Sequence, residues 1–152
     1  MAVYTGDSVE DILNRVSRIF PASRPAFEKI RALIEEFCGM ANLSREDRHK
    51  LTLIVEELFI NTVTHGHKGD CDAPVSITFE EVGTQVALLY EDTAPPFNPL
   101  SSGTGTDAEA LVQARRVGGL GAFLTVQLTR RAEYSFSDGR NRIRLLYSPA
   151  QA

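Results

Sequence analysis

The sequence has no tryptophan, only two cysteines and no long apolar run, and each absence excludes a class of protein. Cys38 and Cys71 lack the CxxC spacing of zinc sites. So few thiols indicate reduced cysteines inside a cell rather than a disulfide framework. No apolar run approaches the about 20 residues of a membrane-spanning helix. No basic stretch followed by an apolar one opens the sequence, so we expect no signal peptide and a cytoplasmic location.

Positive charge is also scarce. The formal net charge is −4 at pH 7, and Arg115-Arg116 and Arg130-Arg131 are only short basic pairs. This balance provides no basic stripe for nucleic acid and gives little support to a DNA-binding helix-turn-helix. The 152 residues, 43% of them apolar, suffice for one domain with a core and are too few for two ordinary domains. We therefore expect one domain over residues 1–152.

Hydrophobic periodicity predicts two helices in the first half of the chain. Apolar residues recur at helical spacing over residues 24–38, and Gly39 is the expected stop. A second helix is predicted over residues 44–65, with Gly66 as its stop. Residues 9–20 fit either a first strand or a helix, because both periodicities occur there.

Strand patterns follow in two pairs, with a loop and helices between them. The first predicted hairpin joins residues 75–80 and 86–90 across Gly83-Thr84, and the second joins 132–136 and 141–147 across Asp138-Gly139. Residues 92–107, with three prolines, predict a loop, and residues 107–116 and 118–129 predict helices. This order predicts an α+β fold, a two-layer α/β sandwich with helices on one face of a mixed, mostly antiparallel sheet.

The second helix combines an expected N-terminal cap with an apolar stripe. Ser44 and Asp47 have the spacing of a capping box, with Asp in place of Glu. One face of the helical wheel carries the apolar stripe, formed by Leu51, Ile54, Val55, Leu58, Phe59 and Thr62. This stripe is expected to face the core.

A polar row runs along the edge of this stripe. Glu57, Asn61 and His65 follow one another at intervals of four residues, and the row is expected to enter the stripe near His65. Burying such groups without partners is costly, so a ligand or metal ion is one expected partner. Glu and Asn oxygens suit Mg²⁺ shared with phosphates, and a Glu can deprotonate a nucleophile. The alternative is purely structural, with Glu57 paired to a cation, Asn61 capping a loop and His65 stabilising the helix end.

Four segments of the chain, taken together, resemble the GHKL or Bergerat-fold ATPases, in the form seen in bacterial anti-sigma-factor serine kinases. Residues 56–67 resemble the N-box E-x-x-x-N-x-x-x-H-G, 91–99 the D-x-G-x-P-F-x-P box, 118–124 the G-G-x-G-x-x-L box, and 134–145 the closing hairpin with G-x-N-x-L. Each box alone is weak. Together they span roughly residues 20–147 in the family's order and spacing, which makes the resemblance specific.

The resemblance implies a role for each matching residue. Asn61 would be the Mg²⁺ ligand, Glu57 the general base and Asp92 the acceptor for the adenine amino group, while His65 would lie near the phosphates. The other implied nucleotide-binding positions are Ala94, Phe97, Gly118, Gly119, Leu120 and Gly121. Backbone amides at these glycines would approach the phosphates at a helix N-terminus. Residues 98–117 would form an ATP lid that is ordered when nucleotide binds.

One position departs from the family pattern. Ala94 stands where the family usually has Gly, close to the adenine. Alanine restricts φ and adds a methyl group, which predicts weaker nucleotide binding. The departure favours an alternative function, a non-catalytic partner-binding module with weak or no nucleotide binding. Glu57 and Asn61 oppose that alternative, because a docking protein does not need a catalytic base.

The function implied by the resemblance is that of an anti-sigma regulatory factor with serine/threonine protein kinase activity. Its cofactors would be ATP and Mg²⁺, and its partners a sigma factor and a small anti-anti-sigma protein that it phosphorylates. Homodimerisation is usual in the resembled family, and neither nucleic acid nor membrane is an expected partner. The catalytic domain of a histidine kinase is disfavoured, because the chain has no room for a phosphoacceptor helix pair and because of the P-F-x-P form of its second box.

Overall fold

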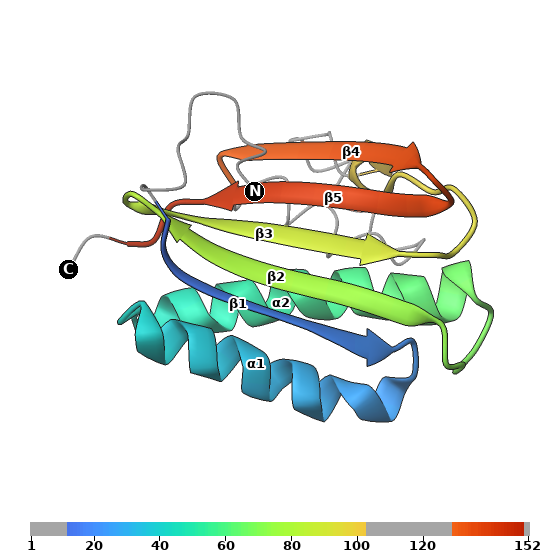
Figure 1. Cartoon of the computed structure of the whole chain (residues 1–152), viewed down its shortest axis with the longest axis horizontal. Coiled ribbons are helices and arrows are strands. Elements are labelled where there is room, and N and C mark those ends of the chain that lie inside the picture. Colours follow the sequence, from blue (N-terminus) through green and yellow to red (C-terminus); the bar gives the residue numbers. More distant parts are fainter. Residues whose placement is uncertain (1–11, 103–128, 151–152) are drawn as a thin grey trace, which may run out of the picture.

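The computed structural model describes residues 12–102 and 129–150, which form a sheet layer and a helix layer (Figure 1). The strands are β1 (Ile12–Pro21), β2 (Pro74–Val82), β3 (Gln85–Asp92), β4 (Arg131–Ser137) and β5 (Arg140–Tyr147), and the helices are α1 (Phe27–Met40) and α2 (Arg45–Asn61). The sheet order is β1-β2-β3-β5-β4, with every neighbouring pair antiparallel. The predicted α+β sandwich is confirmed, and its sheet is wholly antiparallel in the described ranges rather than mixed.

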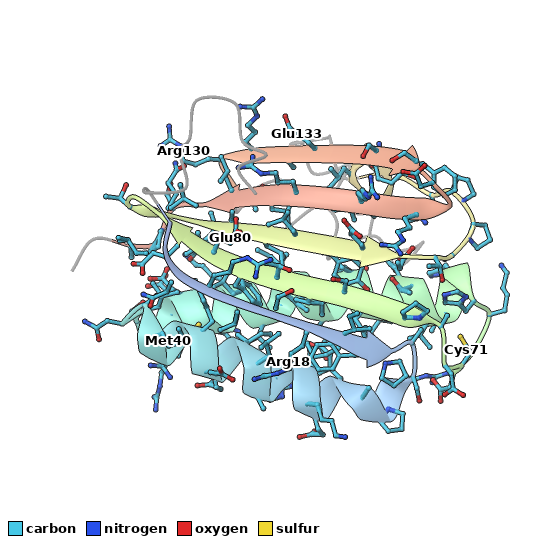
Figure 2. All side chains as sticks on the ribbon, in the orientation of Figure 1. Arg18, Met40, Cys71, Glu80, Arg130 and Glu133 are labelled. Atoms are coloured by element: carbon cyan, nitrogen blue, oxygen red, sulfur yellow. The ribbon has the colours of Figure 1, made fainter. Side chains whose placement is uncertain are left out.

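Strand β1 resolves the segment whose sequence fits both strand and helix. Val16 lies opposite Phe79 of β2 in the antiparallel register, and Val16 and Phe20 are buried. Between them in the sequence lies Arg18, which Figure 2 labels. Arg18 forms an ion pair with Glu36 of α1 at 3.1 Å. β1 lies at the edge of the sheet, and pairing with β2 satisfies the backbone groups that face β2, so the tertiary partner decides between the two periodicities.

The core lies between the sheet and the two helices, which cover the same face (Figure 1). The ring of Phe37 stacks on Phe79 at 5.3 Å between centroids, and Phe27 lies 5.9 Å from Phe59. Every member of the apolar stripe predicted for α2 is buried: Leu51, Ile54, Val55, Leu58, Phe59 and Thr62. The predicted orientation of α2 is therefore confirmed.

Helix α1 passes the glycine that was expected to end it. The helix reaches Met40, and Asn42 then adopts a left-handed φ of 55°. The Leu43 amide donates to the Cys38 carbonyl at 2.9 Å and the Asn42 amide to the Gly39 carbonyl at 3.3 Å. This is a Schellman motif, in which asparagine replaces the more common glycine. Gly39 thus lies inside the last turn rather than after it.

Helix α2 begins as predicted and ends in a wider turn. The Ser44 hydroxyl accepts a hydrogen bond from the Asp47 amide at 3.1 Å, which confirms the expected cap. After Asn61 the chain continues as a π-helical turn, Thr62–Gly66. Gly66 is thus the last helical residue, close to the predicted end. Single π turns inside or at the end of α-helices are frequent at functional sites.

Both predicted hairpins are present, and the second has a well-defined turn. Asp138 and Gly139 connect β4 to β5 with φ values of 54° and 74°, as a type I′ turn requires. The predicted helices 107–116 and 118–129 lie outside the described residues, apart from Thr129. Of the expected lid, residues 98–102 are described, and Pro99–Ser102 form a 3₁₀ turn. Neither α1 nor α2 is long and apolar enough to cross a membrane.

Candidate functional site

A pocket is lined by residues from the end of α2, the end of β3 and the start of β5. These three ends lie at the right-hand side of Figure 1. Its apolar lining comes from Leu58, Tyr90, Ala94, Pro95, Phe97, Pro99 and Ile143, and its polar lining from Asn61, Thr62, Asp92 and Asn141. A mostly apolar cleft with a few convergent polar groups is typical of small-molecule sites. The pocket brings together four of the predicted site residues: Asn61, Asp92, Ala94 and Phe97.

Asp92 is buried at the base of this pocket, with 8% of its surface exposed. Its Oδ2 accepts a hydrogen bond from the Thr62 hydroxyl at 2.7 Å. Its Oδ1 accepts from Asn141 Nδ2 at 2.9 Å and from the Ala94 amide at 3.2 Å. An ionised carboxylate accepts about four hydrogen bonds, so three protein donors fix its orientation and leave capacity for a further donor.

A chain of hydroxyl groups orients the proton of Thr62 toward Asp92. The Tyr90 hydroxyl lies 2.7 Å from Thr62 Oγ1. Complete burial raises the pKa of Tyr90 well above its usual range, so Tyr90 keeps its proton and can donate it to Thr62. Thr62 Oγ1 also lies 3.0 Å from the Leu58 carbonyl, but a charged carboxylate at 2.7 Å is the stronger acceptor. The order of donation is therefore Tyr90 to Thr62 to Asp92.

Asn141 of β5 shapes the segment that follows Asp92. Besides Asp92, its Nδ2 contacts the carbonyls of Ala94 at 3.0 Å and Pro95 at 3.1 Å. Its Oδ1 accepts a hydrogen bond from the Phe97 amide at 3.0 Å. The segment after Asp92 belongs to no strand, so its backbone groups need other hydrogen-bond partners where they are buried. The buried side chain of Asn141 provides these partners.

Glu57 and Asn61 lie together beside the pocket, as their spacing predicts. Burial raises the pKa of Glu57, opposed by a hydrogen bond with Asn61 and by the charge of His65. A carboxyl group with a raised pKa is a stronger proton acceptor once ionised.

His65 departs from its expected position. Its side chain is exposed, so the prediction that the polar row enters the core near His65 is wrong. The reason is the π turn, whose wider spacing moves the residues after Asn61 out of the α-helical row. Thr62, not His65, carries the buried polar group at this end of the helix.

The remaining predicted residues divide between the pocket rim and the part of the chain that is not described. Phe97 is half exposed at the rim. Gly118, Gly119, Leu120 and Gly121 lie outside the described residues. Within the described ranges no three His, Cys, Asp or Glu side chains are close enough to hold a metal ion. A cation at Asn61 would therefore need oxygens from a ligand or water, which is the usual environment of protein-bound Mg²⁺.

Sequence reasoning missed three residues that hold Asp92 in place: Thr62, Tyr90 and Asn141. Thr62 was assigned to the apolar stripe, although a hydroxyl in that stripe signals a need for a partner. Asn141 was seen only as part of the G-x-N-x-L pattern of the last hairpin. Tyr90 alternates as a core residue of β3, and nothing local distinguishes it from its apolar neighbours.

The family is decided by comparison with protein-family models. The model of the histidine kinase-like ATPase domain matches residues 20–147. The chain belongs to this family. The match encloses every lining residue of the pocket, from Leu58 to Ile143. The family resemblance inferred from the sequence boxes is therefore confirmed, and membership implies ATP as the ligand.

The ATPase domain also resembles solved structures. A chain of the crystal structure of the SiaB-SiaC complex from Pseudomonas aeruginosa is 16% identical, with a TM-score of 0.62 over 90% of this chain and 89% of that chain. The Acinetobacter baumannii histidine kinase AdeS is 18% identical, with a TM-score of 0.46 over 91% of this chain and 70% of that chain. No curated protein sequence matches the ATPase domain. At these identities the similarity to the SiaB-SiaC chain shows a shared fold.

Proposed function

We propose that this ATPase domain binds ATP with Mg²⁺ in the pocket and acts in the cytoplasm as a serine/threonine protein kinase and anti-sigma regulatory factor. The observation that carries the proposal is the environment of Asp92. A buried carboxylate, held by Thr62 and Asn141, faces a mostly apolar pocket. An adenine ring requires this combination, because it buries apolar faces and presents an amino group that needs an acceptor.

Asn61 is the residue we expect to hold the metal ion. Asn61 lines the pocket and lies one helical turn after Glu57 on α2. An amide oxygen suits Mg²⁺, which would complete its shell with phosphate oxygens and water. Bound Mg-ATP supplies an activated phosphoryl group. Backbone amides at Gly119 and Gly121 are expected to hold the phosphates.

Glu57 is the residue we expect to accept the proton of the attacking hydroxyl group. Burial raises the pKa of Glu57, which strengthens it as a base, and Asn61 lies one turn away on the same helix. Phosphoryl transfer depends mainly on positioning and charge stabilisation, so one base beside the reacting groups is the only proton acceptor that this proposal needs. The acceptor would be a serine of a protein substrate, or water.

The proposed protein partners are a sigma factor and a small anti-anti-sigma protein that competes for the domain and is phosphorylated on a serine. Support comes from the SiaB-SiaC complex, in which a chain of the same fold binds a second protein. Homodimerisation is a further proposal, based on the sequence resemblance alone.

The second candidate function is a partner-binding module that does not use nucleotide. The observation in its favour is Ala94, which lines the pocket where the resembled family has glycine. This candidate does not explain why Asn61 lines the pocket with Glu57 one helical turn before it, since docking requires neither a base nor a metal ligand.

Calorimetric titration with ATP and ADP, with and without Mg²⁺, tests the binding step. We expect dissociation constants of about 1–100 μM for ATP, dependent on Mg²⁺, since ATP-using enzymes bind substrate in this range. Absence of binding at about 1 mM would contradict the proposed site and favour the docking module.

Release of phosphate from ATP tests the catalytic step. Glu57→Gln keeps the shape of the side chain and removes the base, so we expect ATP affinity to remain and the rate to fall by about 100-fold. The matched control is Glu56→Gln, which changes the neighbouring carboxylate and should leave the rate within about twofold of the wild type. Equal rates in all three proteins would exclude Glu57 as the base.

A further inference from the structure

The segment after Asp92 packs against the π turn through Ala94 and Gly66. Ala94 is 4% exposed, so its methyl group is covered. A Cβ atom placed on Gly66 would lie 2.7 Å from the Ala94 Cβ atom. Carbon atoms in contact are normally about 3.5–4.0 Å apart, so the site has room for one methyl group and not for two.

Gly66 is required here for space and not for its backbone conformation. The described glycines with positive φ are Gly69, Gly83 and Gly139, and Gly66 is not among them. An alanine could therefore adopt the backbone angles of Gly66, and among the described residues the Ala94 methyl group is the one that opposes it. The second nearest atom to the placed Cβ is the Asn61 carbonyl oxygen at 3.7 Å, an ordinary contact.

The π turn contacts the Asp92 segment at two points. Thr62, its first residue, donates to the Asp92 carboxylate, and Gly66, its last residue, receives the Ala94 methyl group. The Ala94 amide in turn donates to Asp92 Oδ1 at 3.2 Å. Displacement of Ala94 by a clash at Gly66 would therefore move a donor of Asp92 directly.

We propose that Gly66 and Ala94 are a size-matched pair that positions Asp92 in the nucleotide pocket. The Ala94 methyl group fills the space left by the missing side chain of Gly66 instead of blocking the ligand. This assignment rests on the proposed nucleotide function of the pocket. It explains how the domain accommodates alanine at a position where the resembled family has glycine.

Exchange of the methyl group between the two positions tests the pair. Gly66→Ala alone overfills the contact and should lower the melting temperature by about 6 °C. Ala94→Gly alone leaves a void of one methyl group and should lower it by about 3 °C. In the double variant the methyl group moves across the contact, and the melting temperature should return to within about 2 °C of the wild type. The control is Gly39→Ala, whose added Cβ meets no atom of residues 12–102 or 129–150 within 4 Å.

A second measurement separates positioning of Asp92 from general stability. The side-chain amide of Asn141 donates to Asp92, so its signals in ¹⁵N NMR spectra report the geometry around the carboxylate. We expect these signals to shift in Gly66→Ala and to return in the double variant. ATP affinity should fall by about tenfold in Gly66→Ala, recover in the double variant and show no gain in Ala94→Gly.

Two results would overturn the proposal. Additive losses in the double variant would show that the residues are not coupled. Tighter ATP binding by Ala94→Gly at an unchanged melting temperature would show that the methyl group obstructs the ligand. If the wild type binds no nucleotide, the proposed function fails, whereas melting temperatures and the Asn141 signals still decide whether Gly66 and Ala94 position Asp92.

Discussion

Two buried aspartates lie at opposite ends of α2, and they differ in what surrounds them. Asp47, 1% exposed, accepts hydrogen bonds from the Tyr147 hydroxyl, from Ser44 Oγ at 2.9 Å and from the Ala150 amide at 3.2 Å. Asp92, 8% exposed, is held by a similar number of donors but borders the pocket. Asp47 belongs to the first turn of α2, whereas Asp92 is the last residue of β3 and bonds to Thr62, just after the end of α2.

The comparison shows that burial and hydrogen bonding do not by themselves identify a functional carboxylate. The contacts of Asp47 join the start of α2 to the segment after β5, so Asp47 is a structural residue. Asp92 is equally well held, but it keeps capacity for a ligand on the side that faces the pocket. Open acceptor capacity at a pocket, rather than burial, distinguishes the two residues.

Removal of Asp47 should have the largest effect on stability. Asp47→Ala leaves the Tyr147 hydroxyl and the Ala150 amide without their acceptor, so we expect a loss of about 3 kcal/mol in the free energy of unfolding. Urea denaturation measures this loss. ATP affinity of the folded variant should stay within about twofold of the wild type, because the pocket is at the other end of α2. If Asp47→Ala lost ATP affinity but not stability, Asp47 would be the functional aspartate and not a structural one.

Neutralisation of Asp92 should have the largest effect on binding. Asp92→Asn replaces a charged acceptor with an amide that offers a donor on one side, so we expect ATP to bind about 100-fold more weakly. Calorimetry measures the change. Glu91→Gln is the matched control, since Glu91 is the preceding residue and its carboxylate pairs with Arg142 at 3.3 Å. A similar loss in the control would indicate a charge effect unrelated to the pocket.

Thr62 offers a smaller test of how Asp92 is held. Thr62→Val keeps the shape and removes the donor, so ATP affinity should fall by about tenfold. Thr64→Val is the control, because the Thr64 hydroxyl donates to the Ile60 carbonyl of its own helix, at 2.7 Å. Equal affinity of both variants would show that Asp92 does not depend on Thr62.

The smallest expected effect is a change in acid sensitivity at the structural end of α2. Burial raises the pKa of Asp47, but hydrogen bonds from Tyr147 and Ala150 outweigh it, so the net pKa lies below the ordinary value of 3.8. A lowered pKa contributes stability above the unfolded-state pKa, and this contribution is lost as the pH falls through the folded-state value. Below about pH 4 the free energy of unfolding should therefore fall less steeply with pH in Asp47→Asn than in the wild type. Urea denaturation at several pH values measures both curves. The same pH dependence of stability in both proteins would contradict this prediction.

Local signals in the sequence were sufficient for most of the fold. The stripe of α2, its cap at Ser44 and the turn at Asp138-Gly139 depend on residues near one another in the chain, and all three are confirmed. The π turn could not be predicted, because Thr62 and Gly66 contact residues distant in the sequence, Asp92 at the end of β3 and Ala94 just after it. The strand at residues 12–21 likewise depended on its partner β2.

The candidate site was predictable where a family box names a residue and not where a distant side chain supports it. Asn61, Asp92, Ala94 and Phe97 were predicted and line the pocket. Asn141 was missed as a site residue because its role depends on the pairing of β3 with β5. That pairing places Asn141 opposite Asp92, although the two residues are 49 positions apart in the sequence. The roles assigned to Glu57, Asn61 and Asp92 in catalysis and binding stay predictions.

The position of Asn141 late in the chain affects how the domain matures during translation. The ribosome makes the chain from its N-terminus, so α2, with Thr62 after it, and β3 emerge before Asn141 and β5. A nascent chain that stops before residue 140 has Asp92 and the N-box but lacks the side chain that shapes the segment after Asp92. Such truncated products should fail to retain nucleotide. Nucleotide binding would then distinguish completed domains from unfinished ones in the cell.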